Sequence, residues 1–305
     1  MKKKWIALSL LVAMMVLCLT GCTEKSAAKE DGQQPEKVSL QLSVEEYPVM
    51  DGSTANLPMM AEVMAEVCDI SLEEAENLTS CQKTPLAWEN ITNGEADILL
   101  VYEAAEETKA LVEQSGVALE ITPIGRDALV FINNAQNPVK DLSQQQLIDI
   151  YTGKITNWNE VGGDDSAIVP YQRGETSGSQ SLFMKLLMKD ETPMAAPQEL
   201  KPAEMGMLID ELARYNNTGN ALGYSVFYYA SYMYQQPGLN MLAVDGVLPS
   251  DQTIADGSYP LLNEYYVVIR AEEAEDSPAR RLRDWILTAE GKVAMEKAGY
   301  IPVQG

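Results

Sequence analysis

The chain has no histidine among its 305 residues, and only 22 lysines and arginines stand against 45 aspartates and glutamates, which gives a net charge of -23. Without histidine the chain cannot build a Ser-His-Asp triad, a Cys-His nucleophile pair or an HExxH zinc helix. The shortage of basic residues argues against a nucleic-acid binder. Enzymes that work through carboxylates or lysine stay open on composition alone, but we expect a protein that is not an enzyme, holds no metal or cofactor and does not bind DNA or RNA.

The N-terminus lacks an apolar run long enough to cross a membrane. Lys2, Lys3 and Lys4 precede an apolar stretch over residues 5–19, which ends in Leu-Thr-Gly-Cys22. A spanning helix needs about 20 apolar residues, so the shorter stretch predicts an export signal over residues 1–21. The last four residues resemble the lipobox of bacterial lipoproteins, which implies a lipid anchor on Cys22 at the outer face of the cytoplasmic membrane. The alternative is a plain secretory signal in which Cys22 is incidental.

The next segment, residues 22–36, is poor in residues that form a core. From Thr23 onward it has no aromatic and no aliphatic β-branched residue. Such a segment cannot bury enough apolar surface to offset the entropy lost on ordering, so we expect a flexible tether.

Two cysteines, Cys68 and Cys81, lie beyond the tether. Outside the membrane a disulfide between them is possible. Two free thiols are the alternative, and residue pattern alone does not separate the two.

From about residue 37 onward, hydrophobic periods of strands and helices alternate, which favours α/β units with largely parallel sheets. The predicted strands span 38–44, 96–102, 119–124, 128–133, 167–171, 223–227, 241–244 and 265–270. The predicted helices span 57–67, 87–93, 106–115, 143–151, 178–187, 205–215, 279–287 and 290–298.

The segment that joins the predicted strand 167–171 to the predicted helix 178–187 carries the groups of an anion site. Arg173 offers a planar fork of donors, Ser177 and Ser179 offer hydroxyls, and Gly178 allows close approach of the backbone. The helix start adds unpaired N–H groups and the positive end of the helix dipole. The alternative is a capped helix beside a surface arginine.

The same region resembles a known family. The segment Tyr-Thr-Gly-Lys-Ile-Thr-Asn-Trp-Asn-Glu-Val-Gly-Gly at residues 151–163, followed by residues 173–179, is similar to the phosphate-binding lipoproteins of bacterial phosphate ABC transporters. The resemblance covers nearly the whole mature chain and is strongest in this central block. It implies the α/β type II periplasmic-binding-protein fold, with two lobes, a hinge of two strands and a ligand cleft. Lobe one would comprise residues 37–125 and 262–305, and lobe two residues 126–261.

The resemblance also implies a binding site. Its strongest part is Arg173, Ser177, Gly178 and Ser179, where Ser179 replaces the usual threonine. Lobe one would add the hydroxyl residues Ser53, Thr54 and Thr84.

The family also places an acidic acceptor after the strand 96–102, where this chain has Tyr102 followed by Glu103. We expect Glu103 to be the acceptor if the alignment shifts by one residue. Without that shift Tyr102 faces the ligand, and Glu103 is a solvated charge at a helix start.

The family implies capture of phosphate, or of a similar oxyanion, by lobe closure. The protein would act as a monomer, held to the membrane by its lipid anchor, and would deliver the ligand to an ABC permease with its ATPase. The alternative is a sensory or adhesive lipoprotein on the same fold, or a receptor for a different ligand.

Overall fold

A computed structural model of the protein describes residues 39–175, 177–214 and 220–303. All of these residues belong to one compact unit. The predicted signal over residues 1–21, the tether over 22–36 and the lipid site Cys22 lie outside the described residues. Within the described ranges, no helix has the length and apolar character needed to cross a membrane.

The centre of the unit is a mixed sheet of eight strands. Six of them follow the order β1-β2-β9-β3-β6-β5, and β7 and β10 also pair with β3. The strands are β1 Met50–Gly52, β2 Ile98–Tyr102, β3 Leu119–Asn134, β5 Val169–Pro170, β6 Ala221–Val226, β7 Leu239–Met241, β9 Leu262–Arg270 and β10 Ile301–Pro302. A separate pair joins β4 (Asp141–Leu142) to β8 (Ala243–Val244).

The direction of the strands differs from the prediction of largely parallel sheets, which was wrong. In the large sheet only β1–β2 and β5–β6 are parallel, whereas β2–β9, β9–β3, β3–β6, β3–β7 and β3–β10 are antiparallel. The reason is that β9 returns from late in the chain and inserts between β2 and β3. Periodicity reports which residues are buried, and it does not report which strand becomes a neighbour.

Four of the predicted strands also change. Residues 39–44 form no strand, and the strands expected at 119–124 and 128–133 are one continuous strand, β3, with an irregular register between Pro123 and Gly125. The strand expected at 241–244 is divided between β7 and β8, which belong to different sheets.

Most predicted helices are confirmed within a few residues, and two short ones, α2 and α8, escaped prediction. The helices are α1 Leu57–Cys68, α2 Leu72–Leu78, α3 Lys83–Asn93, α4 Glu106–Ser115, α5 Gln144–Tyr151, α6 Gly178–Leu182, α7 Met205–Arg214, α8 Asp251–Ala255, α9 Pro278–Ile286 and α10 Ala289–Lys297. Helix α6 continues into a π-helical segment, Phe183–Met188.

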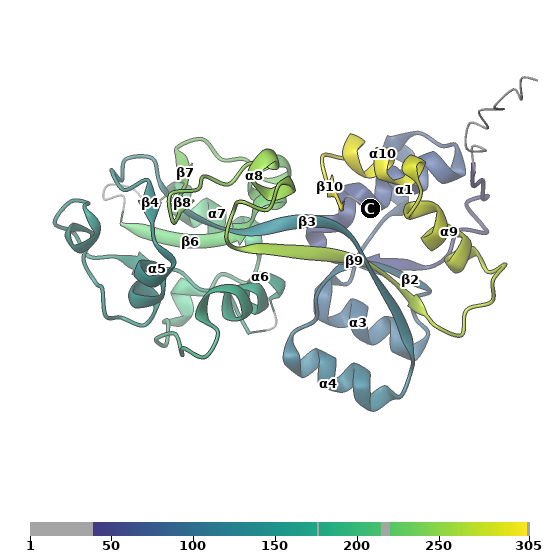
Figure 1. The fold of residues 1–305 in the computed structure, drawn as a ribbon, viewed down its shortest axis with the longest axis horizontal. Helices are drawn as coiled ribbons and strands as arrows, with labels where there is room; N and C mark the ends of the chain where they lie inside the picture. Colours follow the sequence, from purple (N-terminus) through teal and green to yellow (C-terminus); the bar gives the residue numbers. More distant parts are fainter. Residues whose placement is uncertain (1–38, 176, 215–219, 304–305) are drawn as a thin grey trace, which may run out of the picture. The chain divides into compact units, whose positions relative to one another are not determined.

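Figure 1 shows that the elements form two groups, with β3 and β9 running from one group to the other. Lobe one contains α1 to α4, α9, α10, β1, β2 and β10, and lobe two contains α5 to α8 and β4 to β8. The paired strands β3 and β9 therefore form the two-strand connection that the family resemblance implies for the hinge. The residue boundaries predicted for the lobes stay a prediction.

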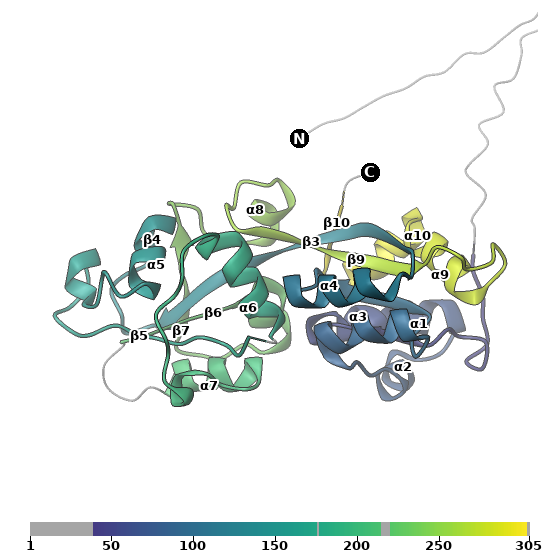
Figure 2. The same ribbon diagram turned by 90° about the horizontal axis from the view of Figure 1, so that it is seen from below.

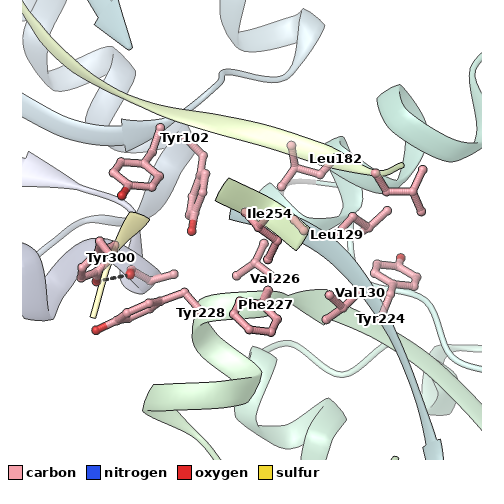
Figure 3. Close-up of a cluster of buried hydrophobic side chains, with 14 of the residues drawn as sticks. Tyr102, Leu129, Val130, Leu182, Tyr224, Val226, Phe227, Tyr228, Ile254 and Tyr300 are labelled. Atoms are coloured by element: carbon pink, nitrogen blue, oxygen red, sulfur yellow. Dashed lines mark hydrogen bonds between the residues drawn. The ribbon is translucent and has the colours of Figure 1, made fainter. Parts of the chain in front are cut away.

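Aromatic rings dominate the interior near this connection. Figure 3 shows Tyr102 and Tyr300 on the lobe-one side of a buried cluster that continues to Leu129 and Tyr224. Behind them in lobe two, Phe183 stacks on Tyr224 with ring centroids 4.5 Å apart and an interplanar angle of 2°. This packing holds the end of α6 close to β6.

The two cysteines beyond the tether, Cys68 and Cys81, are free and partly buried. Of the two alternatives considered for them, the structure therefore has the free thiols. Burial raises the pKa of both thiols.

Candidate ligand-binding site

A cavity of about 600 Å³ lies where the two lobes meet. Its walls include all but one of the residues that the sequence singled out: Ser53, Thr54, Thr84, Arg173, Ser177, Gly178 and Ser179. These residues come from both lobes and from distant parts of the chain. The structure therefore brings together the two halves of the predicted site.

The polar wall consists of helix starts. A short 3-10 helix begins at Thr54, α3 begins at Lys83 and α6 begins at Gly178. The first N–H groups of a helix have no partner within that helix and attract anions. Figure 2 shows α6 of lobe two facing α3 and α4 of lobe one.

The serines at two of these starts do not cap their own helices. Ser53 precedes the 3-10 helix and Ser177 precedes α6, and neither side chain accepts a bond from the helix that follows. Elsewhere in the chain, by contrast, Ser143 and Ser277 do cap their helices. The hydroxyls bond to other side chains or strands instead, Ser53 to Thr84 and Tyr102 and Ser177 to Ser179, so neither helix start is capped by the serine before it.

Arg173 is the most unusual residue of the cavity. Its side chain is buried, with 6% of its surface exposed. Nη2 donates to the carbonyl of Ala203 at 2.9 Å, while Nε and Nη1 are buried and have no hydrogen-bond partner in the described part of the chain. Burial lowers the pKa of Arg173. A buried cation with unused donors is costly unless an anion joins it.

The main chain of Arg173 is fixed by its neighbours. Its N–H donates to Oε1 of Gln180 at 3.1 Å and to the hydroxyl oxygen of Tyr224 at 3.0 Å. Tyr224 in turn donates to Gln180. These hydrogen bonds link the loop before α6 to β6. They fix the position of the Arg173 backbone, which carries the guanidinium at the cavity.

Lobe one supplies a chain of hydroxyls. Oγ of Ser53 accepts from the N–H of Tyr102 at 3.0 Å and lies 2.7 Å from Oγ1 of Thr84. The ring of Tyr102 lines the cavity, and its hydroxyl donates to a carboxylate oxygen of Asp127 at 2.5 Å.

Glu103, the eighth predicted residue, does not line the cavity, so the one-residue shift that would make it the acceptor is wrong in this structure. Its carboxylate accepts from Lys109 at 2.6 Å and from Lys185. Burial alone would raise the pKa of Glu103, but the bonds from the two lysines outweigh it and lower the pKa. The reason is the register of β2, which turns Tyr102 toward the cavity and Glu103 toward α4.

The pair of Glu103 and Lys185 joins the two lobes, because Glu103 follows β2 and Lys185 lies in the π-helical segment after α6. We expect Glu103→Gln to weaken ligand binding by about two- to fivefold, since exposed ion pairs contribute about 0.2–1 kcal/mol and this one forms only when the lobes meet. Titration calorimetry of Glu103→Gln, Lys185→Gln and the double variant would measure the coupling. Glu106→Gln, which removes an exposed partner of Lys109 within lobe one, is the matched control. Wild-type affinity in Glu103→Gln, Lys185→Gln and the double variant would contradict the expectation.

A second ion pair crosses between the lobes. Nζ of Lys83 lies 2.7 Å from a carboxylate oxygen of Glu204, and both side chains are exposed at the cavity rim. Sequence reasoning missed both residues, as well as Lys201, Met205 and Tyr229 in the cavity wall. Lys83 stands next to Thr84 and could have been found by that position; the segment before α7 has no pattern that signals a site.

No cluster of acidic or cysteine side chains suited to a metal ion occurs among the residues that the structure describes. The donors of the cavity are arginine, lysine, hydroxyl and N–H groups, which suit an anion.

Comparison with known proteins identifies the family. The model of the PBP superfamily domain matches residues 42–290, and the chain belongs to this superfamily. It is similar to the phosphate-binding protein PstS of Bacillus subtilis (strain 168), with 25% identity over 312 residues that cover 99% of this chain and 95% of that protein. It is also similar to protein SphX of Synechocystis sp., with 29% identity over 59% of this chain and 56% of that protein.

Solved structures agree. A protein from Clostridium perfringens, described as a phosphate ABC transporter substrate-binding protein with bound phosphate, matches with a TM-score of 0.62 and 27% identity over 85% of this chain and 100% of that chain. An ABC-type phosphate transport receptor from Vibrio cholerae has the same fold, with a TM-score of 0.62 and 21% identity over 83% of this chain and 99% of that chain. The type II periplasmic-binding-protein fold expected from the sequence is confirmed, and the chain is a binding protein rather than an enzyme.

Proposed function

We propose that this chain is a solute-binding protein that captures phosphate, or a similar oxyanion, and delivers it to an ABC permease with its ATPase. The proposal rests on one observation above all. Arg173 is buried at the cavity with two nitrogen atoms unpartnered in the described residues, beside three helix starts of the kind that attract anions.

The role in transport is supported by relatives rather than by the cavity. The B. subtilis relative is named for phosphate binding, and the C. perfringens protein is described with both phosphate and an ABC transporter. The mechanism would be capture by closure, because donors from both lobes can surround a dehydrated anion only when the lobes meet.

The location is part of the same proposal. The apolar stretch and Leu-Thr-Gly-Cys22 support a lipid anchor on Cys22, so the protein would stand on the outer face of the cytoplasmic membrane as a monomer. Labelling of cells with radioactive palmitate checks the anchor. Incorporation should occur in the wild type and be lost in Cys22→Ser.

Titration calorimetry with phosphate, arsenate and sulfate tests the ligand class. We expect reversible one-to-one binding of phosphate and arsenate, which have the same shape and charge. Failure of all three oxyanions to bind or to raise the unfolding temperature would refute the oxyanion receptor, while the fold would stand.

A further inference from the structure

A tyrosine of lobe one holds the backbone segment that brings Ser53 and Thr54 to the cavity. Tyr300 lies between α10 and β10; it is buried and does not line the cavity. Its hydroxyl donates to the carbonyl of Ala55 at 2.5 Å. Ala55 lines the cavity beside Ser53 and Thr54, so Tyr300 can act on the site through the backbone of Ala55.

The hydroxyl of Tyr300 takes the place of a regular helix bond. The 3-10 helix Thr54–Asn56 runs directly into α1, which begins at Leu57. In a regular α-helix the carbonyl of Ala55 would accept from the N–H of Met59, four residues further on. Here the carbonyl accepts from Tyr300 instead. Burial raises the pKa of Tyr300, and a hydrogen bond from the N–H of Met59 acts in the opposite direction. A side chain inserted between two such backbone groups keeps the segment out of the regular helix.

The other end of this segment is held independently of Tyr300. The N–H of Ser53 donates to the carbonyl of Leu100 at 3.2 Å, and Oγ of Ser53 accepts from the N–H of Tyr102 at 3.0 Å. Thr54 lies between the attachment at Ser53 and the one at Ala55. The position of Thr54 at the cavity therefore depends on both attachments.

A tyrosine of lobe two holds Tyr300 in turn. Tyr228 follows β6, and its ring stacks on that of Tyr300 with centroids 3.8 Å apart and an interplanar angle of 19° (Figure 3). The hydroxyl of Tyr228 donates to the carbonyl of Ala298 at 2.5 Å, two residues before Tyr300. The stack is thus a contact between the lobes, and it lies one residue away from the segment that carries Thr54.

We infer that Tyr300 is a positioning residue for the oxyanion site and that Tyr228 makes its effect depend on contact between the lobes. Tyr300 keeps Thr54 at the cavity, and Tyr228 supports Tyr300 only where the two lobes meet. This inference rests on the proposed oxyanion receptor and adds to it two residues that do not line the cavity.

Tyr300→Phe tests the positioning role, because it keeps the stacked ring and removes only the hydroxyl. The carbonyl of Ala55 and the N–H of Met59 can then bond to each other and draw the segment into α1. We expect the affinity for inorganic phosphate, measured by titration calorimetry of the full chain, to fall by about tenfold.

The matched control is Tyr259→Phe. Tyr259 is also buried, and its hydroxyl donates to the carbonyl of Leu129 at 3.0 Å, away from the cavity. Each variant loses one buried bond from a tyrosine to a carbonyl, so both should unfold at a lower temperature than the wild type. Only Tyr300→Phe should lose affinity, whereas a purely structural role would leave the affinity of the folded protein unchanged.

A double-mutant cycle tests the part of Tyr228. Tyr228→Leu removes the stack and should weaken phosphate binding by about threefold to tenfold. Because both residues act on the same segment, the loss in the double variant with Tyr300→Phe should be smaller than the product of the two single losses. Tyr300→Phe decides the positioning role even where Tyr228→Leu does not fold.

Wild-type phosphate affinity in Tyr300→Phe, or an equal loss in Tyr259→Phe, would overturn the inference and leave the oxyanion receptor intact. A double variant whose loss equals the product of the single losses would overturn the role of Tyr228. Binding of none of phosphate, arsenate and sulfate by the wild type would overturn both the inference and the proposed function.

Discussion

Replacement of Arg173 by alanine is expected to weaken oxyanion binding by about 30-fold or more, because loss of one partner of a buried charge pair costs about 2–5 kcal/mol and each 1.4 kcal/mol is tenfold in affinity. Nε and Nη1 of Arg173 are buried donors that have no partner in the described residues. Titration calorimetry with phosphate would measure the loss.

Two further variants separate charge from geometry. Arg173→Lys keeps the positive charge but loses the planar fork of donors, so its affinity should fall between those of the wild type and Arg173→Ala. Arg214→Ala removes an exposed arginine whose partner is Asp210 and should leave binding unchanged. Wild-type affinity in Arg173→Ala would contradict the proposed site.

The same variant should not unfold the protein. Without ligand, the guanidinium is a buried cation whose one hydrogen bond within the described residues is to the carbonyl of Ala203. Its removal relieves a desolvation cost as well as losing that bond, so the unfolding temperature of ligand-free Arg173→Ala should not fall. A normal unfolding temperature together with lost binding would place the effect in the site rather than in the fold.

Asp127 is expected to make stability depend on pH. Its carboxylate lies on β3 and is 2% exposed. It accepts from the N–H of Ala128 at 2.7 Å, from the hydroxyl of Tyr102 in lobe one at 2.5 Å and from the N–H of Tyr228 in lobe two at 3.1 Å. Burial raises the pKa of Asp127 to about 6, although these hydrogen bonds act in the opposite direction.

The raised pKa of Asp127 decides whether stability rises or falls with pH. The pKa of Asp127 is higher in the folded protein than its ordinary value of 3.8, so the folded state holds the proton more tightly. The stabilisation is complete below about pH 4 and is lost as the pH rises to about 6. The difference between a pKa of 3.8 and one of about 6 corresponds to about 3 kcal/mol in the free energy of unfolding.

Urea unfolding of the wild type and of Asp127→Asn at several pH values isolates this contribution, since other groups titrate equally in both. We expect the stability of the wild type relative to Asp127→Asn to fall by up to about 3 kcal/mol between pH 4 and pH 7. Tyr102→Phe removes a bond that lowers the pKa, so the fall should move to higher pH in that variant. A difference that stays constant with pH would contradict the buried, proton-binding carboxylate.

Several elements could be predicted from the sequence because their causes are local. Helices α1 and α4 follow from hydrophobic spacing over consecutive residues, and α4 has the predicted bounds. The anion segment from Arg173 to Ser179 is also local, since a strand end, a glycine and a helix start follow one another along the chain. A short helix such as α8 has too few turns for its hydrophobic spacing to be recognised in the sequence.

Tertiary structure decided what depends on distant neighbours. Strand order is one case, because β9 reaches its place between β2 and β3 only after the chain has built lobe two. The choice between Tyr102 and Glu103 is another. Side chains alternate along a strand, so the pairing of Tyr102 with Tyr265 across β2 and β9 sets which of the two faces the cavity.

The sequence by itself thus determined the class of protein and most of the donors of its site: an acidic chain without histidine, built from α/β units, with Arg173 and Ser177 at a helix start. Only the tertiary structure placed Thr84 against Gly178 and paired Glu103 with Lys185. It also buried Arg173 with two nitrogen atoms that have no partner in the described part of the chain. The physical reason is that burial and pairing are properties of contacts between the lobes, and no local pattern records them.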